Sequence, residues 1–203
     1  METTLVLGGT GKTGRRVVER LGARGLPVRV ACRAGAPPFD WEAQATWAPV
    51  LRGVGSVHVS YAPDLAIPGA VEAVGAFIEL VVMCGVRRLV LLSGRGVEEA
   101  QRCEQVLGDA GADWTIVRSG WFDQYFSESF SLDSVLAGEV ALPAAEVGEP
   151  FIDAEDIADV AVAALTEDGH AGRLYEVAGP RLLTFAEAVA EIAKAAGRQI
   201  RYL

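Results

Sequence analysis

The chain of 203 residues is long enough for one domain with a full-sized hydrophobic core, and its 51% of hydrophobic residues exclude a disordered chain. A formal net charge of −9 argues against nucleic acid or an anionic membrane as the main partner. Scattered cysteines, no recognisable signal peptide and no apolar run of the roughly 20 residues that a membrane span needs predict a cytoplasmic protein. The two histidines, His58 and His170, are too few and too far apart for a metal cluster.

The first two dozen residues carry the strongest local signal. Thr4–Leu7 is a short apolar run typical of a buried strand, and Val17, Val18 and Leu21 recur at helical spacing after it. Between them lies a glycine-rich turn, residues 8–14. Strand, glycine turn and helix are the opening of a dinucleotide-binding βαβ unit.

The glycine turn fits the pattern G-x-G-x-x-G at Gly9, Gly11 and Gly14. In such a unit the glycines permit the tight turn, the approach of a pyrophosphate and the close packing of helix on strand, and the helix N-terminus attracts the phosphates. A P-loop is excluded, because its first glycine would have to stand where Val6 stands. The predicted cofactor-binding residues of the turn are Gly8, Gly9, Thr10, Gly11, Lys12, Thr13 and Gly14.

Arg33 follows the second predicted strand, Val28–Cys32, at the place that distinguishes the two nicotinamide cofactors. An acidic residue there binds the ribose 2′-hydroxyl of NAD, whereas an arginine suits the 2′-phosphate of NADP. No acid occurs before Asp40, and Lys12 adds positive charge nearby. The sequence therefore predicts NADP(H) in preference to NAD(H); a solvated surface arginine is the alternative.

Helices and strands alternate along the rest of the chain. Further strands are expected at 39–41, 54–61, 88–92, 114–118, 139–142, 174–178 and 199–203. Helices are expected at 45–52, 68–85, 98–107, 132–137, from Asp153 to about 164, and from a capping box at Thr184 and Glu187 to Gly197. This alternation predicts an α/β fold with a parallel sheet, whose ligands lie at the carboxyl ends of the strands. His58, within a strand, is expected to be a core residue rather than a catalytic one.

A series of motifs runs through the whole chain in a fixed order. They are Gly8–Arg15, Phe39–Trp41, Gly85–Ser93, Trp114–Arg118, Trp121–Phe122, Pro150–Asp153 with Asp156–Ala158, Tyr175–Val177, Gly179–Pro180 and Leu183–Thr184. With this series the chain resembles the NmrA-like atypical short-chain dehydrogenases/reductases, in particular the branch of NAD(P)H:quinone oxidoreductases and ergot-alkaloid reductases.

The resemblance implies a single NAD(P)-binding domain over residues 1–203, with a Rossmann-type doubly wound parallel sheet. A small C-terminal substrate lobe would be built mainly from 119–150 and 180–203. The implied site has the backbone of the glycine turn at the pyrophosphate, Arg33 at the 2′-phosphate, Asp40 and Trp41 near adenine, Ser60 and Tyr61 along the ribose, and Ser93, Gly94, Trp121 and Phe122 around the nicotinamide. Two departures are that Tyr125 stands where members commonly have asparagine, and that members usually continue for several dozen residues more.

The residue inventory limits the chemistry. Ordinary short-chain dehydrogenases reduce ketones with a Tyr-x-x-x-Lys pair, but the only lysines here are Lys12 and Lys194, and residues 94–113 contain neither tyrosine nor lysine. Hydride transfer to a quinone- or iminium-type aromatic compound remains, since it needs no strong proton donor. Weak donors are Ser93, Ser119 and Tyr125, although each is more often structural. Trp121, Phe122, Tyr125 and Phe126 could stack on a flat substrate, and packing of the lobe is an equal alternative.

Two other functions remain open at this level. One is a non-catalytic, NADP(H)-sensing regulatory protein, with which the missing Tyr/Lys pair is equally compatible. The other is a tailoring oxidoreductase or oxygenase of an aromatic polyketide pathway in secondary metabolism. The strand expected at 199–203 also leaves a homodimer open, since a partner subunit would be able to complete it.

Overall fold

The computed structural model describes residues 2–144 and 146–203, which form two compact units. Unit 1 contains the chain up to Ser119 together with Glu155–Glu176, and unit 2 contains Gly120–Ala154 and Val177–Leu203. The boundaries of unit 2 lie close to those expected for the lobe, 119–150 and 180–203. That this unit binds substrate stays a prediction.

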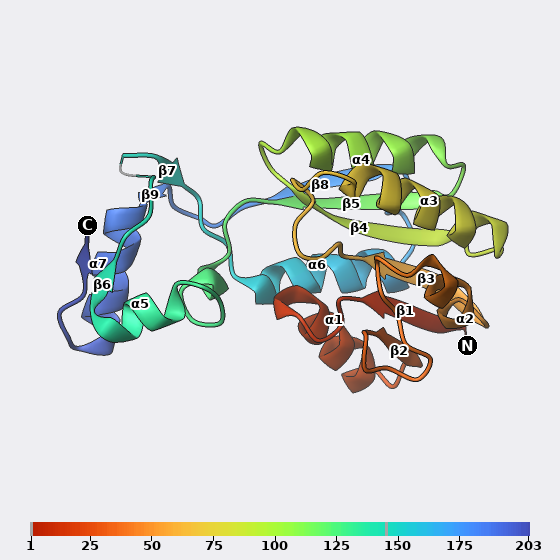
Figure 1. Ribbon diagram of the computed structural model, residues 1–203, viewed down its shortest axis with the longest axis horizontal. Helices are drawn as coiled ribbons and strands as arrows, with labels where there is room; N and C mark the ends of the chain where they lie inside the picture. Colours follow the sequence, from red (N-terminus) through yellow and green to blue (C-terminus); the bar gives the residue numbers. More distant parts are fainter. Residues whose placement is uncertain (1, 145) are drawn as a thin grey trace. The chain divides into compact units, whose positions relative to one another are not determined.

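Unit 1 is built on a six-stranded sheet in the order β2-β1-β3-β4-β5-β8 (Figure 1). Its strands are β1 (Thr3–Leu7), β2 (Val28–Ala31), β3 (Val54–Val59), β4 (Arg88–Gly94), β5 (Asp113–Ser119) and β8 (Arg173–Val177). Strands β1 to β5 pair in parallel throughout. The strand order changes direction between β1 and β3, the point at which sheets of this kind bind nucleotides. The predicted α/β Rossmann-type sheet is confirmed.

Helices cover both faces of this sheet. Figure 1 shows α3 (Ala70–Met83) and α4 (Glu98–Asp109) on one side, and α1 (Lys12–Ala23) and α6 (Ala154–Thr166) on the other. The strands are apolar on both faces because both are buried. The core on the α3 and α4 side contains Leu5, Leu7, Val57, Val59, Val74, Phe77, Ile78, Val81, Leu89, Leu91, Cys103 and Leu107.

Ion pairs join α1 to α6 at intervals of one helical turn. The Nε atom of Arg16 lies 2.5 Å from a Glu155 carboxylate oxygen, and the Nε atom of Arg20 lies 2.5 Å from Asp159. Arg20 also reaches Glu155 at 2.8 Å, which lowers the pKa of the Glu155 carboxyl. These contacts hold α1, whose N-terminus follows the glycine turn, against the first turns of α6.

The expected strand at 39–41 is wrong, because these residues form a loop and a turn. The Phe39 ring packs on Trp41 at 5.2 Å and on Phe77 of α3 at 5.6 Å, so tertiary aromatic contacts and not a ladder fix the segment. The helix expected at 45–52 is a 3₁₀ turn, η1 (Gln44–Thr46), followed by the short α2 (Trp47–Val50). Helix α3 starts after Gly69 rather than at 68, because Gly69 has a left-handed φ of 87°.

Unit 2 is the smaller unit and combines helices with two-residue strands. Its elements are η2 (Asp123–Tyr125), α5 (Leu132–Ala137), β6 (Glu139–Val140), β7 (Gly148–Glu149), β9 (Leu183–Thr184), α7 (Phe185–Ala196) and β10 (Arg201–Tyr202). Strand β6 pairs in parallel with β10, and β7 pairs antiparallel with β9. The capping box at the start of α7 is confirmed, since the Glu187 N–H bonds to the Thr184 hydroxyl and the Thr184 N–H to the Glu187 carboxylate. A cluster around Phe126, Phe151 and Phe185 forms the core of this unit.

Among the helices that the structure describes, none combines the length and the apolar character needed to cross a bilayer.

Candidate functional site

The glycine turn is held together by contacts that admit no side chain at Gly14. Gly8 has a left-handed φ of 62°, and its carbonyl accepts a hydrogen bond of 2.8 Å from the Gly11 N–H. A Cβ atom placed on Gly14 would lie 2.2 Å from the Gly8 carbonyl oxygen, far inside contact distance. The third glycine of the motif therefore lets α1 approach the end of β1 directly.

The N-terminus of α1 has the features of an anion site. Gly11, the N-cap, offers no side chain to cap the helix, and no acidic residue lies in the first turn. Thr13 is only 4% exposed, yet no described residue forms a hydrogen bond with its hydroxyl oxygen. A buried hydroxyl without a partner is costly, and a phosphate oxygen would satisfy it. These residues fit the pyrophosphate of a dinucleotide.

The segment that follows β2 folds back toward β3. The Arg33 side chain is exposed, and within the described part of the chain it has no hydrogen bond or ion pair. The Trp41 ring lies 4.8 Å from the Tyr61 ring, which follows β3. Asp40 anchors the loop, since its carbonyl accepts a bond of 2.8 Å from the Trp47 indole N–H. The structure thus brings Trp41 and Tyr61 together and leaves the Arg33 guanidinium available.

Ser60 connects this side of the site to the glycine turn. A Cβ atom placed on Gly8 would lie 3.4 Å from the Ser60 hydroxyl oxygen, so the two segments are in near contact at the carboxyl ends of β1 and β3. Burial raises the pKa of the neighbouring Tyr61 hydroxyl.

Near the carboxyl end of β4, the hydroxyl of the predicted donor Ser93 already forms a hydrogen bond within the protein. Its hydroxyl donates a hydrogen bond of 2.5 Å to Glu104 of α4, whose carboxylate also binds Arg118 of β5. Arg118 in turn contacts Glu176 at 3.4 Å. Hydrogen bonding to Glu104 raises the pKa of Arg118.

Glu104 was missed by the reasoning from sequence. The available signal is its position, because it stands on the same face of the predicted helix as Ala100, Cys103 and Leu107, an apolar stripe in which a glutamate needs a partner. Ser119, at the end of β5, is 3% exposed, and its carbonyl accepts a bond of 2.8 Å from the Arg95 N–H.

In unit 2 the predicted substrate residues divide into two groups. Trp121, Phe122 and Tyr125 are half-buried, and the Tyr125 ring lies 5.0 Å from Trp121 and 5.3 Å from Phe122. Phe126 is 5% exposed and packs on Phe151 at 5.7 Å, a core position that does not favour substrate contact.

Phe130 belongs to the same aromatic group, although it was not among the predicted substrate residues. It is 60% exposed, and its ring lies 5.7 Å from Tyr125 and 6.2 Å from Trp121. The signal was present in the sequence, because Phe130 ends the run of aromatic residues that begins at Trp121. We call Trp121, Phe122, Tyr125 and Phe130 the aromatic cluster.

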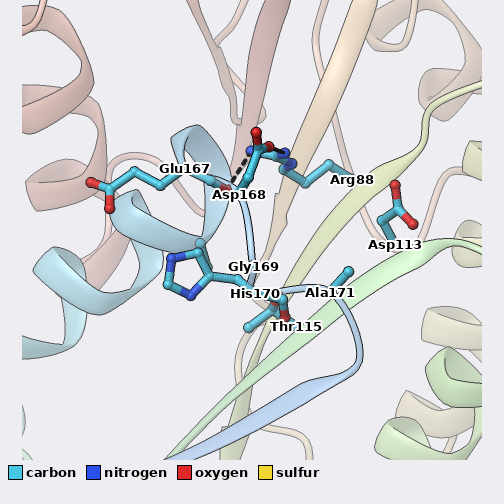
Figure 2. Close-up of a pocket in the computed structure, with 9 residues that line it drawn as sticks. Arg88, Asp113, Thr115, Glu167, Asp168, Gly169, His170 and Ala171 are labelled. Atoms are coloured by element: carbon cyan, nitrogen blue, oxygen red, sulfur yellow. Dashed lines mark hydrogen bonds and ion pairs between the residues drawn. The ribbon is translucent and has the colours of Figure 1, made fainter.

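A cavity of about 140 Å³ lies at the opposite, amino-terminal edge of β4 and β5 (Figure 2). Arg88 closes one side by donating to the carbonyl oxygens of Leu165 and Glu167 and to the Asp168 carboxylate at 2.9–3.2 Å. Thr115 donates a bond of 2.8 Å to the His170 carbonyl. These contacts fix the loop that follows α6, so Arg88 and Thr115 have a structural role beside the cavity. Among the described residues, no three metal-binding side chains converge here or elsewhere.

Comparison with known proteins gives relatives over nearly the whole chain, although no protein-family model matches it. The chain is 32% identical to an NAD(P)H azoreductase from Xenophilus azovorans over 217 residues, covering 98% of the chain and 76% of that protein. It is 31% identical to agroclavine dehydrogenase from Claviceps fusiformis, covering 99% of the chain and 76% of that protein.

Solved structures agree on the fold. The NADPH-dependent quinone oxidoreductase QOR2 from Escherichia coli, solved with NADPH, superposes with a TM-score of 0.80 at 22% identity, covering 98% of the chain and 77% of that structure. Together with the glycine turn and the sheet order, these relatives show that the chain belongs to the NmrA-like atypical short-chain dehydrogenases/reductases and is an NAD(P)H-dependent oxidoreductase.

Proposed function

We propose that the protein transfers a hydride from NADPH to a quinone- or iminium-type aromatic substrate. The observation that carries this proposal is the aromatic cluster, four neighbouring rings that unit 2 leaves partly or largely exposed. Aromatic faces bind flat aromatic compounds by stacking. The relatives named azoreductase and agroclavine dehydrogenase, and the neighbour named quinone oxidoreductase, agree with this class of reaction.

The cofactor would be held by unit 1. The backbone of the glycine turn and the Thr13 hydroxyl would bind the pyrophosphate, Arg33 the 2′-phosphate, and Asp40 with Trp41 the adenine. Ser60 and Tyr61 would line the ribose, and Ser93 with Gly94 would face the nicotinamide. When bound, NADPH supplies the hydride.

The remaining residues limit which acceptors can react. Helix α4 contains no tyrosine or lysine, so it does not supply the Tyr/Lys pair that would protonate an unactivated ketone. A quinone becomes a stabilised phenolate that water can protonate, and an iminium ion becomes neutral on accepting hydride. Tyr125 and Ser119 are the weak donors that we retain, because the Ser93 proton already bonds to Glu104.

The experiment that tests this function measures NADPH binding by fluorescence and NADPH oxidation by absorbance, with a panel of quinones and cyclic iminium ions. Turnover with either class supports the proposal. Tight binding without turnover of any acceptor favours the NADP(H)-sensing alternative, and no binding overturns both.

Two variants of Tyr125 test how the aromatic cluster acts. Tyr125→Leu removes a ring that touches three others, and we expect KM to rise roughly 3- to 10-fold, the worth of one aromatic contact. Tyr125→Phe keeps the ring, and an unchanged kcat would exclude the hydroxyl as proton donor. If KM does not change in Tyr125→Leu, the cluster does not bind the substrate.

A further inference from the structure

Three polar residues meet beneath the carboxyl end of β4. Ser93 and Arg118 are direct partners in the β4–β5 register, and Glu104 of α4 covers them from the same face. One Glu104 oxygen accepts from the Ser93 hydroxyl at 2.5 Å and from the Arg118 Nε at 2.9 Å. The other accepts from an Arg118 terminal nitrogen at 2.5 Å. Both carboxylate oxygens are therefore occupied.

Burying these polar groups costs desolvation free energy, so stabilising the fold is a weak explanation for the arrangement. Glu104 is 7% exposed and Ser93 is 3% exposed, so a charge and a hydroxyl have been removed from water. Buried ion pairs rarely stabilise a fold more than well-packed apolar residues of similar size would. The bidentate contact with Arg118 does fix the orientation of the Glu104 carboxylate.

The fixed carboxylate decides what Ser93 can do. A serine hydroxyl carries one proton, and Ser93 directs it at Glu104. The lone pairs of the Ser93 oxygen remain, so toward any further partner this hydroxyl is an acceptor and not a donor. A hydroxyl can both donate and accept a hydrogen bond, but the contact with Glu104 leaves Ser93 only the role of acceptor toward other groups.

Ser93 lies at the edge of the sheet where an acceptor would be able to bind the nicotinamide part of the cofactor. The strand order changes direction between β1 and β3. The glycine turn follows β1, and the segment with Arg33 follows β2. A dinucleotide that places its adenosine over β1 and β2 places its nicotinamide over β3 and β4, and Ser93 is the last residue but one of β4.

We propose that Glu104, oriented by Arg118, is a positioning residue that holds the Ser93 oxygen as the hydrogen-bond acceptor for the carboxamide N–H of the nicotinamide. This inference rests on the proposed NADPH-binding function. The contact fixes the rotation of the nicotinamide ring and therefore the face that delivers the hydride.

The test compares the dissociation constants of NADPH and of its reduced 3-acetylpyridine analogue, in which a methyl ketone replaces the carboxamide and no N–H remains. Fluorescence titration of the intact protein measures both without turnover. We expect the wild type to bind NADPH roughly 3- to 10-fold more tightly than the analogue, the effect of one neutral hydrogen bond. Ser93→Ala should reduce this ratio to about one.

A double variant tests the part assigned to Glu104. Glu104→Leu with Arg118→Met leaves no unpaired charge in the buried site and frees the Ser93 proton, so the ratio should fall to less than half that of the wild type. If circular dichroism shows that this variant is unfolded, Glu104→Gln replaces it, because its amide NH₂ can donate to Ser93 and reverse the hydroxyl. Thr115→Val is the matched control, since it removes one buried hydroxyl bond at the other end of β5; its ratio should equal that of the wild type.

The outcomes separate the two proposals. A wild-type ratio near one, an unchanged ratio in Ser93→Ala, or an unchanged ratio in the folded Glu104 variants overturns the inference while NADPH binding stands. A protein that binds neither dinucleotide overturns the proposed function and this inference with it.

Discussion

At the scale of single residues, we predict that Arg33 decides between the two nicotinamide cofactors. Its guanidinium is exposed and, within the described residues, without a hydrogen bond or ion pair, so a 2′-phosphate would be its charged partner. Arg33→Asp should weaken NADPH binding and improve NADH binding, reversing the preference by roughly 100-fold or more, since a charge-assisted bond is replaced by repulsion. Parallel fluorescence titrations with NADPH and NADH measure the ratio. An unchanged ratio would show that the 2′-phosphate binds elsewhere.

We expect His58 to make the stability of the fold depend on pH. It is completely buried near the carboxyl end of β3, between Val6 of β1 and Val90 of β4, and neither ring nitrogen has a hydrogen bond from a described residue. Burial lowers its pKa from 6.5 to about 4, because the charged imidazolium is not tolerated there. The prediction that this histidine belongs to the core rather than to the catalytic site agrees with its position.

Because the folded pKa lies below the unfolded value, the folded state binds fewer protons. The stabilisation is complete above pH 6.5 and is lost as pH falls from 6.5 toward 4. We expect the free energy of unfolding to fall by about 2–3 kcal/mol between pH 7 and pH 4.5 on account of His58. Urea denaturation of the wild type and of His58→Leu measures this. A His58→Leu variant with the same pH dependence as the wild type would contradict the assignment.

At the scale of elements, the glycine turn and α1 form one unit whose geometry depends on Gly14. Gly14→Ala forces a Cβ into the Gly8 carbonyl, so the turn must open and dinucleotide affinity should drop at least 10-fold. Gly22→Ala is a matched control in the same helix, because a Cβ there meets nothing within 4 Å. It should leave affinity unchanged and stabilise the protein by up to about 1 kcal/mol. Equal affinities in the two variants would contradict the role given to Gly14.

The sequence predicted most elements of unit 1 to within a few residues, because parallel strands buried on both faces and amphipathic helices have strong apolar patterns. It failed at 39–41, where Phe39 and Trp41 have the composition of a strand. Their rings instead pack on Phe77 of α3, about 40 residues later in the chain. Contacts over such a distance in sequence leave no local signal.

At the scale of the whole molecule, the chain passes between the two units three times. Unit 2 is assembled from Gly120–Ala154 and Val177–Leu203, with Glu155–Glu176 returning to unit 1 in between. The lobe expected from the family resemblance is also made of two separate segments. Local patterns such as the helix beginning at Ala154 indicate an element and not the unit in which it packs.

The sequence by itself determined the dinucleotide-binding unit, the alternation of helix and strand, the capping box of α7 and the absence of tyrosine and lysine from residues 94–113. Each of these depends on residues close together in the chain, or on the residue inventory alone. The tertiary structure decided that Ser93 donates to Glu104, that Phe126 is a core residue while Phe130 is exposed, and that His58 is buried with no hydrogen bond from a described residue. These depend on contacts between distant strands and helices, and the burial and polarity of a side chain are set by those neighbours rather than by its own type.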